Sequence, residues 1–81
     1  MPNLLILGAG GLGHMIYENA QPTRQFDRIA MLDDAAKEPA VIGKLVDYKA
    51  LRREYPCAVA AFGNNKMRVH WVEKLLEADF V

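Results

Sequence analysis

The sequence predicts a small α/β domain built on a short parallel sheet, with the first strand in its centre. Two patterns support this prediction: short apolar segments that are typical of buried strands, and amphipathic segments that alternate with them. Strands that alternate with helices need right-handed crossovers, which make the strands parallel and place helices on both faces of the sheet. We therefore expect a three-layer domain.

The first expected strand is Leu4–Leu7, four apolar residues without alternation. Such a run is typical of a parallel strand covered on both faces, and it is too short to span a membrane. A glycine-rich turn follows at once, in which Gly8, Gly10 and Gly13 fit the pattern G-x-G-x-x-G. In that pattern the first glycine allows a tight turn, the second lets a phosphate approach the backbone, and the third lets the next helix pack on the strand.

The turn leads into an expected helix over Leu12–Ala20, which Gln21-Pro22-Thr23 ends. The first amides of a helix have no partner inside it and lie at the positive end of its dipole, so they attract an anion. The turn is therefore a candidate phosphate or nucleotide site. The alternative is that its glycines serve only a tight strand-to-helix connection. His14, in the first turn of this helix, either touches a ligand or is solvated.

The second expected strand is Phe26–Leu32, with Ile29–Leu32 as its buried part and with Asp33 and Asp34 at its carboxyl end. In dinucleotide-binding folds an acidic residue about twenty positions after the glycines accepts hydrogen bonds from a ribose. Asp33 and Asp34 fall in that window. A solvated turn is the alternative, because aspartate is common in turns.

A polar connection, Ala35–Ala40, and a short extended piece, Val41–Gly43, come next. Asp47 is expected to cap a helix over Tyr48–Glu54, because aspartate accepts hydrogen bonds from the first amides of a helix.

The third expected strand, Cys57–Phe62, ends in the turn Gly63-Asn64-Asn65. Asn65 is expected to cap the last helix, over Lys66–Ala78, and both asparagines offer side-chain amides at the mouth of the sheet. The final residues, Phe80 and Val81, resemble the beginning of another strand. The core face of the last helix is expected to contain apolar residues at helical spacing: Met67, Trp71, Leu75 and Ala78, joined by Val72 and Leu76.

Parallel strands bring their carboxyl ends to one edge of a sheet, and the chain is expected to leave the central strand in one direction and return on its other side. That reversal opens a crevice, the usual ligand position in such sheets. Backbone amides would hold phosphate there, the aspartates a ribose or an amine, and the asparagines a base edge or the ribose. The candidate binding residues are Gly8, Gly10, Gly11, Leu12, Gly13, Asp33, Asp34, Gly63, Asn64 and Asn65.

Length and composition favour one domain over residues 1–81, since 81 residues with 52% hydrophobic content can form a single core but not a catalytic domain as well. The net charge is zero and the basic residues are scattered, so we expect no nucleic-acid or membrane partner.

The single cysteine, Cys57, forms no internal disulfide and is expected to be a buried, reduced thiol. No metal ligands or catalytic residues stand out. The start of the chain lacks a signal-peptide pattern, which predicts a cytoplasmic location.

Motifs along the whole chain resemble the N-terminal domain of the PglD/NeuD-type sugar acyltransferases, which belong to the left-handed β-helix, or hexapeptide-repeat, acyltransferases. In that family this Rossmann-like domain is implied to bind a UDP-linked amino sugar. A following β-helix domain is implied to bind acetyl-CoA, to carry the catalytic histidine and to form trimers. The motifs are LLILGAGGLG at Leu4–Gly13, LDD at Leu32–Asp34, VIG at Val41–Gly43, and FGNN at Phe62–Asn65 with Arg68 and an amphipathic helix after it.

The resemblance assigns the glycine-rich turn to the phosphates or the sugar, Asp33 and Asp34 to the nucleoside, and Gly63–Asn65 to the opposite wall of the crevice. The chain departs from the family in two ways: Leu12 stands where a histidine is common, and the 81 residues contain no hexapeptide repeat. We therefore expect a chain that binds a UDP-linked amino sugar and has no cofactor or catalytic residue of its own. Acetyl transfer would need the β-helix domain. The alternatives are an NAD(P)-type dinucleotide-binding module and a structural or oligomerisation domain.

Overall fold

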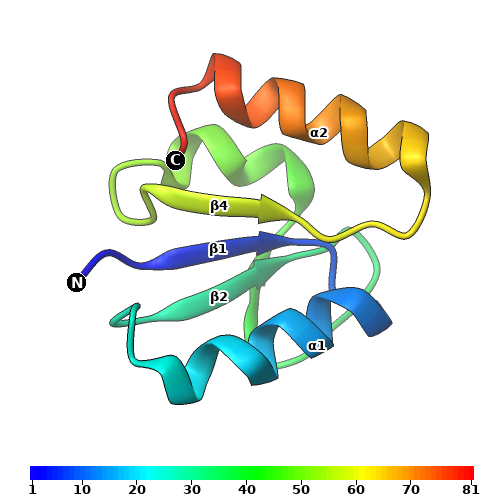
Figure 1. Cartoon of the computed structure of the whole chain (residues 1–81). Helices are drawn as coiled ribbons and strands as arrows, with labels where there is room; N and C mark the ends of the chain where they lie inside the picture. The colour runs from blue at the N-terminus through cyan, green and yellow to red at the C-terminus, as the bar shows by residue number, and fades with distance from the viewer.

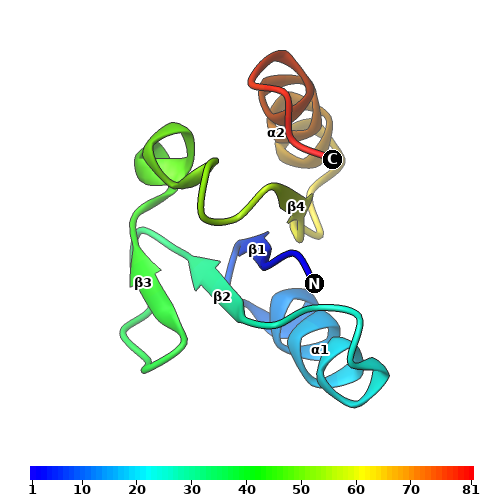
Figure 2. The same ribbon diagram turned by 90° about the vertical axis from the view of Figure 1, so that its left-hand side faces the viewer.

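The structure, a computed structural model, describes residues 1–81 and confirms the α/β class (Figure 1). All four strands are parallel and lie in the order β3-β2-β1-β4, so β1 is flanked by β2 and β4 as predicted. Helix α1 covers one face of the sheet, and η2 and α2 cover the other (Figures 1 and 2). The elements are β1 (Leu4–Leu7), α1 (Gly11–Ala20), the 3-10 turn η1 (Gln21–Thr23), β2 (Ile29–Leu32), β3 (Val41–Gly43), the 3-10 helix η2 (Leu45–Leu51), β4 (Cys57–Ala60) and α2 (Asn65–Glu77).

The central strand β1 carries the core on both of its faces. Leu5 and Leu7 pack in a cluster with residues of η2 and α2, whereas Leu4 and Ile6 pack in a second cluster that α1 covers. The side chains of Leu5, Ile6 and Leu7 are fully buried, and burial of each contributes about 1.5–3 kcal/mol to folding. The run of apolar residues without alternation therefore predicts the strand correctly.

The short extended piece Val41–Gly43 is a fourth strand. Its sequence alone does not show whether it pairs in the sheet or belongs to a turn. β3 pairs in parallel with β2, with a register irregularity between Met31 and Leu32. A parallel connection normally needs a dozen or more residues. Here the eight residues between Leu32 and Val41 make the connection without a helix, and Gly43 lies opposite Leu32.

The helix expected over Tyr48–Glu54 is instead the 3-10 helix η2, which begins at Leu45. Asp47 does not cap it from outside but lies in its first turn, where its carboxylate accepts a hydrogen bond from the Lys44 amide at 2.9 Å. The Leu45 amide donates to the carboxylate of Asp34 at 3.0 Å. These two carboxylates satisfy the first amides of the element, so it starts earlier than its own sequence indicates.

Strand β4 is shorter and less buried than expected. It ends at Ala60, and of its four residues only Ala60 is buried. Cys57 is half-buried, which corrects the expectation of a buried thiol. The reason is position, because β4 lies at the edge of the sheet and has a neighbouring strand, β1, on one side only.

The last helix, α2, turns fewer apolar side chains to the core than its pattern predicts. Leu75 is buried, and Trp71 packs edge-on against Tyr48 with ring centroids 5.3 Å apart. Val72 and Leu76 are exposed instead, Leu76 to 66% of its surface. β4 is the edge strand of the sheet, and Val72 and Leu76 line an open groove beside it.

The fold requires glycine at position 13. A Cβ atom there would lie 1.9 Å from the carbonyl oxygen of Gly8. Gly13→Ala should therefore push α1 away from β1 and lower the free energy of unfolding by about 3 kcal/mol, measured by urea denaturation. Gly11→Ala is the matched control, since a Cβ there meets no atom within 4 Å and the change should alter stability by less than about 1 kcal/mol. Equal effects of the two changes would contradict this account.

Candidate functional site

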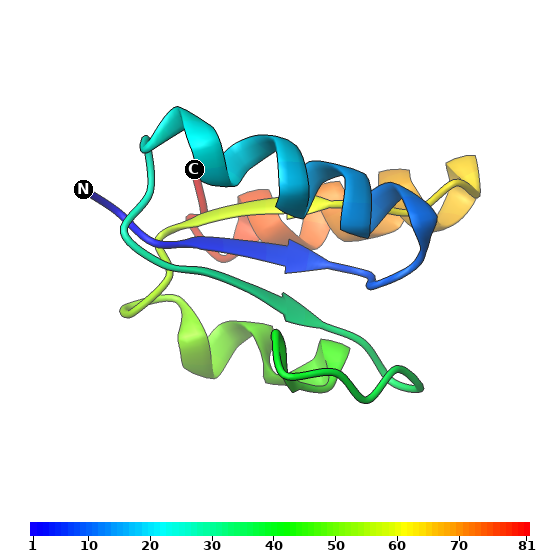
Figure 3. The same ribbon diagram turned by 90° about the horizontal axis from the view of Figure 1, so that it is seen from below.

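The three predicted loops lie at one edge of the sheet, where the carboxyl ends of β1, β2 and β4 meet (Figure 3). The Gly8 amide donates to the carbonyl of Leu32 at 2.7 Å, and the Ala61 amide donates to the carbonyl of Leu7 at 2.8 Å. Gly8 adopts a φ of 103°, and a Cβ there would lie 2.9 Å from the carbonyl oxygen of Ala61. Gly8 and Gly13 thus have structural roles.

Three other glycines have no such role. A Cβ at Gly10, Gly11 or Gly63 would meet nothing within 4 Å, and none of them has a positive φ. The fold therefore does not need glycine at these positions. Their effect is to leave the backbone uncovered at the carboxyl edge of the sheet.

The N-terminus of α1 is open. No side chain caps it, and the amides of Gly11, Leu12 and Gly13 donate to no group of the chain. Leu12 packs against the core cluster that holds Leu4 and Ile6, so its side chain contributes to folding. The arrangement presents unpaired donors at the positive end of a ten-residue helix, a suitable environment for an anion.

The carboxylate of Asp33 binds backbone amides. It accepts hydrogen bonds from Ala9 at 2.8 Å, from Ala35 at 2.8 Å and from Ala36 at 2.9 Å. These hydrogen bonds hold the pKa of Asp33 below its ordinary value of 3.8, and the bond from Ala36 has the largest effect, followed by those from Ala9 and Ala35. Burial of the carboxylate raises the pKa, but this effect is smaller. Asp33 therefore ties the glycine-rich turn to the loop after β2.

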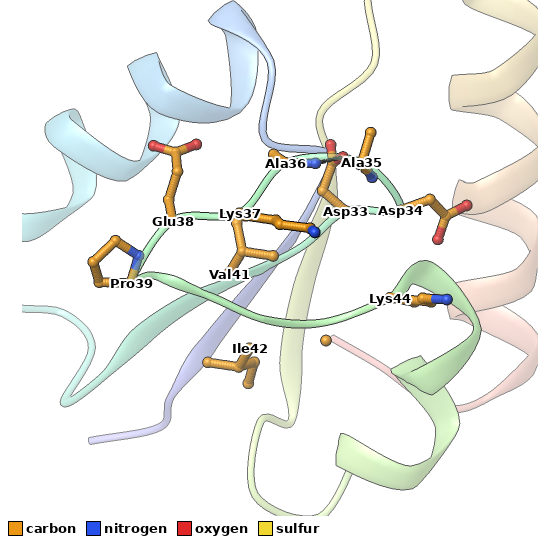
Figure 4. Close-up of a pocket in the computed structure, with 11 residues that line it drawn as sticks. Asp33, Asp34, Ala35, Ala36, Lys37, Glu38, Pro39, Val41, Ile42 and Lys44 are labelled. Carbon is orange, nitrogen blue, oxygen red and sulfur yellow. Dashed lines mark hydrogen bonds between the residues drawn. The ribbon is translucent and has the colours of Figure 1, made fainter.

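That loop and β3 surround the largest hollow of the molecule, of about 510 Å³ (Figure 4). Asp34 lies on its rim and uses one oxygen to bind the Leu45 amide. Lys37 and Lys44 line the hollow and form no ion pair, whereas Glu38 pairs with His14 of α1 at 2.8 Å. The hollow is lined by Asp33, Asp34, Ala35, Ala36, Lys37, Glu38, Pro39, Val41, Ile42, Gly43 and Lys44.

The turn after β4 lies at the same edge but does not line the hollow. Asn64, not Asn65, caps α2, because its side-chain oxygen accepts from the Met67 amide at 3.1 Å. The side-chain oxygen of Asn65 accepts from the guanidinium of Arg68. The side-chain NH2 groups of both asparagines make no bond within the chain and are available as donors.

The sequence pattern did not single out Lys37, Glu38 and Lys44, which line the hollow. They fall in a connection whose only visible signal is its polarity, and they gather around a hollow because β3 pairs with β2. The sequence does not decide whether His14 contacts a ligand or solvent, and in the structure its Nε2 pairs with the carboxylate of Glu38. No group of three or more side chains suits a metal ion, and no helix is long and apolar enough to cross a membrane.

The parallel sheet, the glycine-rich turn and the open helix N-terminus define a small Rossmann-like α/β domain. More particularly, the chain belongs to the PglD N-terminal domain family, whose model matches residues 3–75. This match confirms the resemblance found in the motifs. A comparison with curated protein sequences gives no significant match.

Two solved structures share the fold, both of the acetyltransferase domain of PglB from Neisseria gonorrhoeae FA1090. The structure in complex with acetyl coenzyme A is 29% identical, with a TM-score of 0.88 over 96% of this chain and 40% of that one. A second structure of that domain is 26% identical, with a TM-score of 0.89 over 99% of this chain and 42% of that one. The chain thus spans about two fifths of the length of these relatives.

The role of Asp33 predicts a pH dependence of stability. Asp33→Asn should lower the free energy of unfolding at pH 7 by about 2 kcal/mol, because hydrogen bonds to a charged group are lost. The folded pKa lies below the unfolded one, so this contribution is present above pH 3.8 and is lost as the pH falls through the folded pKa. Urea denaturation at pH 7 and at lower pH should show the difference between the two proteins shrink on acidification.

Asp27→Asn is the control for that comparison. Asp27 is 62% exposed and pairs with the terminal ammonium of Met1 at 3.4 Å, so the change should cost less than about 1 kcal/mol. A difference between the native protein and Asp33→Asn that stays constant with pH would contradict the assigned role.

Proposed function

We propose that this chain binds a UDP-linked amino sugar and serves as the N-terminal domain of a sugar acetyltransferase. Membership of the PglD N-terminal domain family supports the proposal, as does the likeness to a domain solved with acetyl coenzyme A. The main structural support for the proposal is the turn at the end of β1. This turn has unpaired backbone amides, and the fold does not require the glycines at positions 10 and 11.

The turn offers a binding mode for the diphosphate. Three amides, those of Gly11, Leu12 and Gly13, are free to donate to phosphate oxygens, and the dipole of α1 adds positive potential. The lack of a side chain at Gly10 and Gly11 lets phosphate oxygens come within hydrogen-bond distance of the backbone.

The neighbouring hollow offers a place for the nucleoside. Its volume of about 510 Å³ is in the range of small-molecule sites. The carboxylate of Asp33 already accepts hydrogen bonds from three backbone amides, whereas only one oxygen of Asp34 accepts such a bond. The second oxygen of Asp34 is therefore the acceptor that we assign to the ribose or the base. Lys37 and Lys44 add unpaired cations that complement the charge of the phosphates.

The turn Gly63-Asn64-Asn65 flanks the glycine-rich turn on the other side. Its two side-chain NH2 groups are suitable donors to sugar hydroxyls. We assign no catalytic residue to this chain. In this proposal, acetyl-CoA binding, the catalytic base and trimerisation belong to a β-helix domain in a longer chain, and the protein works in the cytoplasm.

Direct titration tests the proposal. Calorimetry with a UDP-linked amino sugar, NAD⁺ and coenzyme A should give heat of binding with the UDP-sugar alone. Gly10→Val should weaken that binding at least about tenfold, because the side chain occupies the space of one phosphate hydrogen bond or more. Its cost to folding should be about 1 kcal/mol, since valine is a poorer N-cap than glycine.

Met15→Ala is the control, because Met15 is exposed on the next turn of α1 and should leave the affinity unchanged. Binding of NAD⁺ without UDP-sugar would favour the dinucleotide-binding alternative. Equal affinity of native and Gly10→Val protein for the UDP-sugar would place the ligand elsewhere.

A further inference from the structure

We propose that the pair of His14 with Glu38 links ligand binding to proton uptake: the diphosphate binds more tightly when His14 is an imidazolium than when it is neutral. This inference rests on the proposed function, because it takes the diphosphate of a nucleotide sugar as the ligand. It gives a role to two side chains that the proposed binding mode does not use.

The lining of the hollow carries a net negative charge, which is unfavourable beside a bound diphosphate. Its charged side chains are three carboxylates and two ammonium groups, those of Asp33, Asp34, Glu38, Lys37 and Lys44. Like charges repel, and the repulsion is strongest where solvent screens it least. One further positive charge would make the lining neutral.

His14 can supply that charge. Its Nε2 lies 2.8 Å from the carboxylate of Glu38, and Figure 4 shows Glu38 pointing from the loop toward α1. Histidine is the side chain whose charge ordinarily changes between pH 5 and 8. An imidazolium at this distance offsets the charge of Glu38, whereas a neutral imidazole can donate the same hydrogen bond but leaves the carboxylate charge in place.

The position of His14 in α1 makes its charge sensitive to a ligand at the turn. It is the fourth residue of the helix, directly after Gly11, Leu12 and Gly13, whose amides we assign to the phosphates. The positive end of the helix dipole disfavours a cation there in the free protein, and a bound diphosphate opposes this effect. Binding of the diphosphate and protonation of His14 therefore favour each other, as linkage requires.

The surroundings of His14 offer it no other charged partner. Helix α1 packs on β1, β2 and η1, and none of these three elements contains a titratable side chain. On α1 itself Tyr17 and Glu18 lie about one turn further on, and neither forms an ion pair. The charged groups of the facing loop are those that line the hollow, and of these Glu38 alone pairs with His14.

Calorimetry with UDP-N-acetylglucosamine at pH 6 and pH 8 tests the inference, because this ligand has no group that titrates between these values. The affinity of the native protein should fall about fivefold as the pH rises, an effect of the size expected for partly exposed charges. The side chains of His14 and Glu38 are 42% and 38% exposed. Binding should also take up protons, so its heat should vary with the ionisation enthalpy of the buffer.

Two neutral substitutions should move the affinity at pH 8 apart. His14→Gln removes the cation that offsets Glu38, so its affinity should be as low at pH 6 as at pH 8. Glu38→Gln removes the repelling carboxylate, so its affinity at pH 8 should reach that of the native protein at pH 6. His70→Gln is the matched control and should keep the native pH profile, because the second histidine of the chain lies on α2, across the sheet from α1 (Figure 2).

The outcomes separate this inference from the proposed function. Binding of equal affinity at pH 6 and pH 8 would overturn the inference and leave the proposed function in place. Lower affinity in both His14→Gln and Glu38→Gln at pH 8 would also overturn it, in favour of a pair that only holds the loop. Absence of binding at both pH values would contradict the proposed function as well. Both changes are at partly exposed positions and should leave the fold intact, which circular dichroism checks.

Discussion

One carboxylate, that of Asp33, holds together the two loops on which the edge of the sheet depends. Its bonds to Ala9 on one side and to Ala35 and Ala36 on the other fix the glycine-rich turn relative to the loop after β2. The close approach of Gly13 to Gly8 then fixes α1 on the same turn. The open amides of α1 and the hollow beside β3 are therefore both joined to Asp33 through the backbone that it binds.

β1, β2 and β4 could be predicted because each rests on a local pattern, and the central place of β1 follows from the crossover connections. Four apolar residues before a glycine-rich turn are enough to identify β1, and its burial on both faces follows from the absence of alternation. β3 could not be identified in this way, since three residues carry no period and its pairing depends on β2. The start of η2 was missed for a similar reason: Asp34, eleven positions away, satisfies the Leu45 amide.

The common position of the three candidate loops was predictable from the sequence, but the contacts of their residues were not. Parallel strands bring the glycine-rich turn, Asp33-Asp34 and Gly63–Asn65 to one edge, and the structure places all three there. The pattern could not tell a carboxylate that binds a ligand from one that binds backbone amides, because both follow a buried strand. Nor could it reveal Lys37 and Lys44, which meet around the hollow through the pairing of β3 with β2.

The loop between β2 and β3 is held by hydrogen bonds at both of its ends. Asp33 and Asp34 secure its beginning, and the Val41 amide, bonded to the Glu38 carbonyl at 2.9 Å, secures its return into β3. Among the side chains of residues 37–39, that of Glu38 pairs with His14. Substitutions at these three positions can therefore change the lining of the hollow without breaking the hydrogen bond that joins Asp33 to the glycine-rich turn.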